Sequence, residues 1–244
     1  MLAEKWKKAI EQIKELSEIK IPRCYCYYND ANPVVRIDLH GFSDSSLSAY
    51  GACVYLKFLK KNGETNISLV AAKSRVAPLK NTQTIPRLEL MGNVILARLE
   101  NSVMDAFQNE IQIDNVYCHT DSTISLSWVK AVQKEFQPFV QNRVNEIRQK
   151  VDPESWYYCP TDQNPADLLT RTDNDGLNSA LWWEGPEFLK VSDFYSSQSM
   201  APGGNEMVDF QKELKPQKTS TLLLAANDTD KISVDKVIDI NRYV

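Results

Sequence analysis

The chain has 244 residues and ordinary globular composition, with 28 basic and 32 acidic side chains and therefore a net charge of −4. This length allows one large domain, or a mid-sized domain with extensions, and a sizeable core. The charge excludes a global basic field that attracts nucleic acid, so binding of that kind must depend on local Lys and Arg or on metal ions.

Apolar side chains with helical spacing mark the beginning of the chain. They share one face, with Lys and Glu opposite, and are Trp6, Ile10, Ile13, Leu16 and Ile19. The pattern predicts an amphipathic helix over residues 3–19 that packs on its own domain or on a neighbouring one, with membrane contact as the alternative. Pro22 ends this helix.

Three strands are predicted next. From Val34 the residues alternate, and those that point to one side are Val35, Ile37 and Leu39. Residues 49–59 are almost continuously apolar, which is typical of a strand buried on both faces. Residues 67–72 follow the Asn62-Gly63 turn as a third strand. The short connections predict an antiparallel meander.

Helices and short strands alternate in the middle of the chain. Helices are predicted over 86–107, from Ser122 onward, over 139–151 and from Asn164 onward, where Asn164 is the cap and Pro165 the first helical residue. Short strands are predicted at 116–120 and 155–159. This order predicts an α/β fold, a mixed sheet with helices on both faces.

The periodicity fades beyond Thr172. Residues 181–186, Leu-Trp-Trp-Glu-Gly-Pro, form a compact apolar segment that we expect to pack against the domain. Residues 192–230 are polar and rich in Ser, Gly and Gln, which predicts a linker or disorder. Residues 232–244 are consistent with the start of another unit.

The cysteine pattern indicates the compartment. The five cysteines are odd in number and include no Cys-x-x-Cys pair, which predicts reduced thiols in an intracellular protein, cytoplasmic or nuclear. With two histidines in the chain, a structural zinc site is not expected. No signal peptide or membrane span is visible, since the apolar run 222–226 is far too short, so we expect no membrane partner.

Four acids can be placed at one edge of the predicted sheet. Asp44 and Asp121 each follow an apolar strand, and both emerge at the same edge if those strands are parallel neighbours. Glu89 and Asp167 each lie near the start of a helix. Clustered carboxylates repel one another unless a cation is present. Magnesium takes such oxygen ligands, and two ions can activate water at a phosphodiester. The pattern therefore predicts a metal site that cuts a nucleic acid strand.

Each of these acids also has a purely structural alternative. Asp44 can be a turn residue, and Asp121 can be a helix cap. Asp167 can be a capping-box acid that the helix dipole favours. Glu89 can be a solvated acid of the first helical turn. The case for a site therefore depends on whether the four acids converge in space.

Several short runs carry a family resemblance. They are Phe42-Ser43-Asp44, Tyr50-Gly51-Ala52, residues 70–78, Ile85-Pro86-Arg87-Leu88-Glu89-Leu90, Thr120-Asp121-Ser122, Asn164-Pro165-Ala166-Asp167 and the Trp-rich run 181–186. Together, over about residues 20–190, they resemble the ribonuclease H-like region of Pao/BEL-type LTR retrotransposon polyproteins. No single run is specific, but their combination is.

The resemblance implies a ribonuclease H-like fold with a mixed five-stranded sheet and helices on both faces. It also implies cleavage of the RNA strand of RNA–DNA hybrids with two Mg²⁺ or Mn²⁺ ions as cofactors. The implied catalytic residues and metal ligands are Asp44, Glu89, Asp121 and Asp167. An RNA–DNA hybrid, or another nucleic acid, is then the expected partner.

The resemblance also suggests how the chain is divided. We expect an N-terminal helix and linker over 1–30, the domain itself over 31–174, an appended Trp-rich segment over 175–191, and a mostly disordered tail over 192–244. The helix resembles the end of the connection from a reverse transcriptase, and the tail resembles the approach to an integrase. Both regions of a parent polyprotein are therefore expected partners.

Basic and hydroxyl side chains near the acids are candidates for substrate contacts. The basic candidates, which can meet phosphates, are Lys73, Arg75, Lys80 and Arg87. The hydroxyl candidates, which can donate to the backbone or to 2′-hydroxyls, are Ser45, Ser122 and Thr123. A solvated charged loop is the alternative for the basic set.

Two positions depart from the family pattern. Cys159 stands near the place where this family often carries a histidine, and Gly92-Asn93 lies in the long helix where small alanines are usual. A helical Gly costs about 1 kcal/mol. A decayed copy that only binds nucleic acid is therefore one alternative function. A DNA strand-transfer enzyme on the same fold is another, although such enzymes usually place a Glu on the final helix.

Overall fold

The computed structural model describes residues 31–80, 83–171, 179–191 and 204–216, together with positions 4, 6, 7, 10, 11, 13, 19–22 and 24–26. The predicted beginning of another unit at 232–244 lies outside the described residues. None of the described helices is long and apolar enough to cross a membrane.

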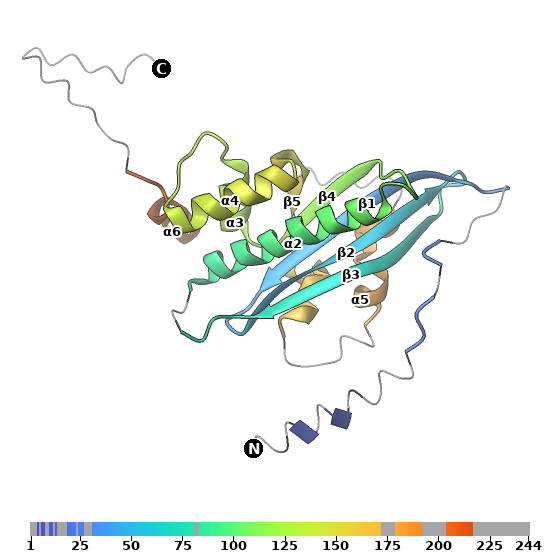
Figure 1. Ribbon diagram of the computed structural model, residues 1–244, viewed down its shortest axis with the longest axis horizontal. Helices are drawn as coiled ribbons and strands as arrows, with labels where there is room; N and C mark the ends of the chain where they lie inside the picture. Colours follow the sequence, from blue (N-terminus) through green and yellow to red (C-terminus); the bar gives the residue numbers. More distant parts are fainter. Residues whose placement is uncertain are drawn as a thin grey trace, which may run out of the picture.

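A five-stranded mixed sheet forms the centre of the molecule (Figure 1). Its strands are β1 (Val34–Ser45), β2 (Ala49–Lys60), β3 (Thr65–Val76), β4 (Asn115–Thr120) and β5 (Trp156–Tyr158). They lie in the order β3-β2-β1-β4-β5, with β1, β2 and β3 antiparallel and with β4 parallel to both β1 and β5. The antiparallel meander is confirmed, and its strands are longer than the sequence predicted.

Helices cover both faces of this sheet. The α-helices are α2 (Ile85–Phe107), α3 (Thr123–Lys130), α4 (Pro138–Lys150), α5 (Ala180–Glu184) and α6 (Gly204–Lys212). The 3₁₀ helices are η2 (Pro153–Ser155), η3 (Thr161–Gln163), η4 (Pro165–Leu169) and η6 (Glu187–Lys190). The helix α2 lies across β1 and β2 on one face with α4 beside it, while η4, α5 and η6 lie on the other (Figure 1). The α/β fold with helices on both faces is confirmed.

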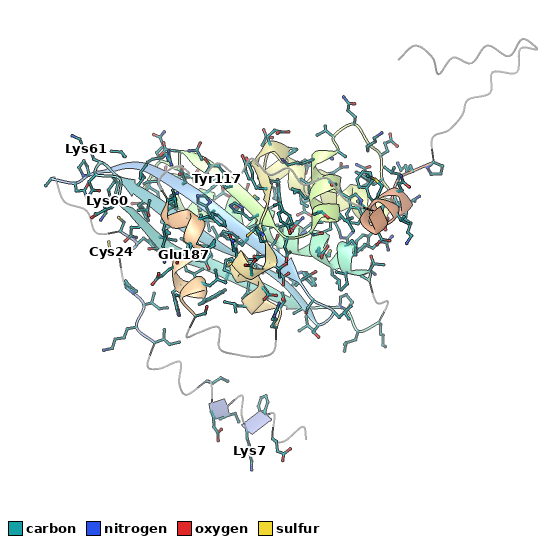
Figure 2. The ribbon with its side chains drawn as sticks, turned by 180° about the vertical axis from the view of Figure 1, so that it is seen from behind. Lys7, Cys24, Lys60, Lys61, Tyr117 and Glu187 are labelled. Carbon is teal, nitrogen blue, oxygen red and sulfur yellow. The ribbon has the colours of Figure 1, made fainter. Side chains whose placement is uncertain are left out.

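The Trp-rich segment covers the second face of the sheet, as expected. The hydroxyl of Tyr55 donates to the carbonyl oxygen of Trp182 at 2.8 Å, and the buried Lys57 ammonium donates to the carbonyl oxygen of Val191 at 2.7 Å. Figure 2, seen from behind, shows α5 and η6 over the strands, with Glu187 labelled on η6 and Tyr117 on β4. This cover explains why the polar side chains of Asp38 and His40, on that face of β1, are buried.

Two expectations about helices need correction. The helix predicted from Asn164 begins as expected, because the Asn164 side chain accepts a hydrogen bond from the Ala166 N–H. It is not an α-helix, however, since residues 165–169 form the 3₁₀ helix η4. The short turn is held by the Thr170 N–H, which bonds the Asp167 carbonyl rather than one four residues back. The linker or disorder predicted from residue 192 does not hold over 204–216. These residues form α6 and a docked segment, because Phe210 and Leu214 pack on the core.

The described residues of the N-terminal helix are largely exposed, and the cysteines, all of them among the described residues, form no disulfide. The described residues between 4 and 13 are helical, but Trp6 and Ile13 are 69% and 62% exposed. The predicted packing of this helix on its own domain is therefore not seen among the described residues. All five cysteines are free thiols, as the odd number predicted.

Candidate active site

The parallel pairing of β1 and β4 brings Asp44 and Asp121 to one edge of the sheet. Ser43 pairs with Thr120 in the register of the two strands, so the next residue of each strand is an acid. The carboxyl ends of parallel strands open at the same edge, which is where ligands bind in sheets of this kind. The two acids therefore converge as the sequence predicted.

The other two acids approach from helices. Asp167 lies in η4, which packs on β1 and β2. Glu89 lies at the beginning of the second turn of α2 rather than in the first, because the helix begins at Ile85, one residue earlier than predicted. The hydroxyl of Ser122, the residue after Asp121, donates a hydrogen bond to the Glu89 carboxylate. Because Ser122 is the N-cap of α3 and follows Asp121 directly, this bond holds the Glu89 side chain close to Asp121.

The electrostatics of the site reflect this crowding. Burial, followed by the negative charges of Asp121 and Asp167, raises the pKa of Asp44 to about 6, although a hydrogen bond from Thr170 acts in the opposite direction. Burial also raises the pKa of Asp121, with a smaller contribution from Asp167, while the hydroxyl of Thr161 opposes it from 2.9 Å. Three acids therefore act on one another through space.

Hydroxyl and guanidinium groups orient the carboxylates. The Thr170 hydroxyl donates to the Asp44 carboxylate, and the Arg171 guanidinium pairs with the Asp167 carboxylate at 2.7 Å. Thr161, Thr170 and Arg171 were not among the predicted site residues. The i, i+4 spacing of Asp167 and Arg171 was the one available signal, because the contacts of the two threonines arise only from the fold.

The departure at Gly92-Asn93 has a structural reason. A Cβ atom on Gly92 would lie 3.0 Å from the carbonyl oxygen of Asp44, so the glycine lets α2 approach the end of β1. Asn93 is fully buried, accepts from the Ser43 hydroxyl at 2.7 Å and donates to the Ser125 hydroxyl at 3.0 Å. Asn93 thus links α2, β1 and α3, and Gly92 lets α2 lie against Asp44, so both residues have a structural role.

We expect Asn93→Ala to lower the free energy of unfolding by about 1–3 kcal/mol, since two buried hydroxyls lose a partner. Asn101→Ala is the matched control, because Asn101 lies on the same helix and bonds an exposed Asp105 carboxylate. Urea unfolding of the two variants measures the difference. Equal stabilities for both variants would contradict the bridging role of Asn93.

The candidate substrate contacts do not all lie at the acids. Lys73 and Arg75 are exposed on β3, which β2 separates from β1, and with Arg98 they line a small pocket beside the middle of α2. Lys80 lines a different pocket, with Tyr50 and others. The register sets Ser74 level with Asp44 across β2, so Lys73 and Arg75 lie two strands away from this acid, at the same end of the sheet.

Three hydroxyl candidates lie next to the acids in the chain or in space, and one arginine lies on the helix that carries Glu89. Ser122 caps α3 and contacts Glu89, Thr123 follows it as the first residue of α3, and Ser45 follows Asp44 at the end of β1. Arg87 lies two residues before Glu89, but it is paired with Glu213 at 2.7 Å. Their contacts with substrate remain predictions.

Cys159 lies in the second core of the domain. It is 1% exposed, and its backbone N–H bonds the Thr120 carbonyl at 3.0 Å. Burial raises the pKa of its thiol above the ordinary range, with a further contribution from Asp121. The thiol is therefore neutral and shielded from solvent, and its role in this core is packing.

The donor set at this edge fits a divalent cation that keeps most of its water. Among the described parts of the chain, no group of three or more His, Cys, Asp or Glu side chains is arranged to hold an ion by itself. Magnesium is usually bound by one or two carboxylates together with waters and substrate phosphates, so it does not require such a cage. The buried, crowded Asp44 and Asp121 are the residues for which a cation relieves most repulsion.

The sequence of the first half of the chain decides its family. Residues 1–122 match the model of the Pao retrotransposon-like RNaseH-like domain. The chain belongs to this family. The match includes Asp44, Glu89 and Asp121, while Asp167 lies beyond it. A comparison of this Pao-type chain with curated proteins found no match.

Solved structures that are similar to this Pao-type chain include several ribonucleases H. RNase H1 from the archaeon Halobacterium salinarum is 16% identical, with a TM-score of 0.36 over 59% of this chain and 98% of its own. The N-terminal RNase H domain of a Mycobacterium tuberculosis protein is 14% identical, with a TM-score of 0.35 over 61% and 97%. LC11-RNase H1, solved with an RNA/DNA hybrid, is 13% identical, with a TM-score of 0.34 over 53% and 88%.

Proposed function

We propose that this domain is a divalent-metal-dependent nuclease that hydrolyses the RNA strand of RNA–DNA hybrids. The observation that carries the proposal is the convergence of Asp44, Asp121 and Asp167 where the parallel strands β1 and β4 end. Membership of an RNaseH-like family supports it. The near absence of histidine also fits, because metal-assisted hydrolysis needs no imidazole base.

In this proposal Asp44 and Asp121 hold the metal, with Asp167 and Glu89 completing the shell, directly or through water. When bound, Mg²⁺ or Mn²⁺ supplies a water of lowered pKa and charge stabilisation at the phosphodiester. The chain's own part is orientation: Thr170, Thr161 and Ser122 each hold one carboxylate oxygen. The half-buried Thr123 is then placed to contact the backbone of the nucleic acid, whereas the Ser45 hydroxyl oxygen is buried.

The experiment is an assay on a labelled RNA–DNA hybrid. We expect the full chain to cut the RNA strand with Mg²⁺ or Mn²⁺ and to stop when EDTA removes the metal. Duplex DNA and single-stranded DNA test for strand transfer in parallel, and we expect no joined product. An intact hybrid after incubation with either metal would refute the proposal.

A nucleic-acid-binding remnant is the second candidate. The pairing of Asp167 with Arg171 at 2.7 Å favours it, because that pair neutralises one acid without a cation. Calorimetric titration with Mn²⁺ separates the two functions. A nuclease takes up metal in the millimolar range or tighter, whereas a remnant binds hybrid without it. The contacts with reverse transcriptase and integrase regions, and the cellular compartment, stay predictions.

A further inference from the structure

The segment 204–216 is attached to the body of the domain by several independent contacts. The backbone N–H of Gln137 donates to the Glu213 carbonyl at 2.6 Å, and the N–H of Lys215 donates to the Glu135 carbonyl at 2.9 Å. These bonds and the bridge between Phe136 and Leu214 make a short antiparallel pairing with the connection between α3 and α4. We call residues 204–216 the C-terminal segment.

Aromatic packing adds to this attachment. The ring of Phe210 lies edge-on to the fully buried ring of Phe136, with ring centroids 5.8 Å apart and an interplanar angle of 85°. One polar side chain of the C-terminal segment is also buried, that of Glu213, which is 8% exposed. The segment is thus docked with a carboxylate turned inward.

The inward carboxylate of Glu213 is paired with Arg87. The Nε and Nη2 atoms of Arg87 donate to the two carboxylate oxygens of Glu213 at 2.7 and 3.1 Å. The guanidinium also lies over the Phe139 ring, 4.7 Å from its centroid, and a further nitrogen donates to Gln83 at 3.4 Å. Its position in the first turn of α2, two residues before Glu89, puts Arg87 on the helix that presents a proposed metal ligand.

In a bidentate pair with a carboxylate, a guanidinium uses two nitrogens. A bidentate pair with a phosphate uses the same two nitrogens in a similar geometry. Arg87 cannot make both contacts at once. Its side chain is 30% exposed, so a phosphate can reach it once the carboxylate leaves. A phosphate bound to the same two nitrogens would have to replace the Glu213 carboxylate.

We propose that the C-terminal segment is an autoinhibitory strap, in which Glu213 blocks Arg87 as a phosphate contact of the hybrid. This inference rests on the proposed function, since it assigns Arg87 to the same substrate. Release of the segment exposes Arg87 without altering the four acids. The strap is short and pairs with the connection between α3 and α4 rather than with the sheet, so it can open while the sheet stays folded.

The test measures binding of a fluorescent RNA–DNA hybrid to the full chain, by anisotropy in Ca²⁺ at several salt concentrations. We expect Glu213→Gln to bind about 3–10-fold more tightly than wild type, with the logarithmic salt dependence steeper by about one phosphate contact. Phe210→Ala, which loosens the strap and keeps both charges, should give a similar gain. In an Arg87→Gln background neither change should have an effect.

Glu135→Gln is the matched control, because the Glu135–Lys215 pair at 3.1 Å is exposed and contributes little to docking of the segment, and no contact between Glu135 and Arg87 is seen among the described residues. We expect it to bind like wild type, which separates the blockade of Arg87 from a general loss of negative charge. Melting temperatures verify that each variant is folded. Unchanged hybrid affinity in both Glu213→Gln and Phe210→Ala, with wild type still binding, overturns the strap and leaves the nuclease proposal standing. Failure of every variant to bind hybrid overturns both.

Discussion

Asp121→Asn is expected to abolish the metal-dependent cleavage of RNA–DNA hybrids, with a loss of about a thousandfold or more. A metal ion at a phosphodiester contributes several kcal/mol of charge stabilisation, and each 1.36 kcal/mol or so is a factor of ten in rate. Asn keeps the shape of Asp121 and can still accept from the Thr161 hydroxyl. The loss therefore reports the charge of the carboxylate rather than the fold.

The matched control for this variant is Asp162→Asn. Asp162 is exposed on η3, one residue after Thr161, and is not one of the four proposed metal ligands. We expect it to cleave like wild type. Burial and the charge of Asp167 raise the pKa of Asp121, so the ionised Asp121 side chain is unfavourable in the folded protein. The neutral Asn of Asp121→Asn should therefore leave the melting temperature of the protein unchanged or raise it. Retention of more than about a tenth of the rate by Asp121→Asn would remove this residue from the proposed mechanism.

Glu100→Gln is expected to change the pH dependence of stability more than any other single substitution of a buried acid. Glu100 is 0% exposed in the middle of α2, and burial raises the pKa of its carboxyl group to about 8. The Cys118 thiol donates to one carboxylate oxygen at 2.7 Å, while the other oxygen has no hydrogen-bond partner among the described residues. The folded protein therefore keeps a proton on this group.

The direction of the effect follows from proton linkage. The unfolded chain releases the Glu100 proton near the ordinary pKa of 4.5, whereas the folded chain holds it up to about pH 8. Stability from this group is complete below the unfolded pKa and is lost as the pH rises through 8. A neutral Gln has no such loss. The advantage of Glu100→Gln over wild type should grow by roughly 3–4 kcal/mol from pH 5 to pH 8.5.

Urea unfolding at both pH values measures this difference. Glu110→Gln is the control, because Glu110 is exposed just beyond the end of α2, and its difference from wild type should stay constant with pH. A Glu100→Gln difference that is likewise independent of pH would mean that Glu100 is ionised or solvated in the folded protein. Such a result would contradict its burial against Cys118.

The elements of this fold could be predicted because each has a local cause. The alternation from Val34, the apolar run 49–59 and the helical spacing over 86–107 define β1, β2 and α2 with errors of a few residues. Ser122 was predicted as a cap, and its side chain does accept from Ser125. Local rules failed at 204–216, where polar composition predicted disorder. There Phe210 and Leu214 are too few to show a pattern, and their burial depends on Phe136, far away in the chain.

The sequence by itself determined the residue types of the candidate site, the order of the strands and helices, and the family. Only the tertiary structure decided what lies beside each acid. The β1–β4 register brings Asp44 and Asp121 together, while Thr170 reaches Asp44 across 126 residues of chain. The tertiary structure also pairs Arg87 with Glu213. Such contacts join segments distant in sequence, and local spacing carries no information about them because they form only when the sheet and helices pack.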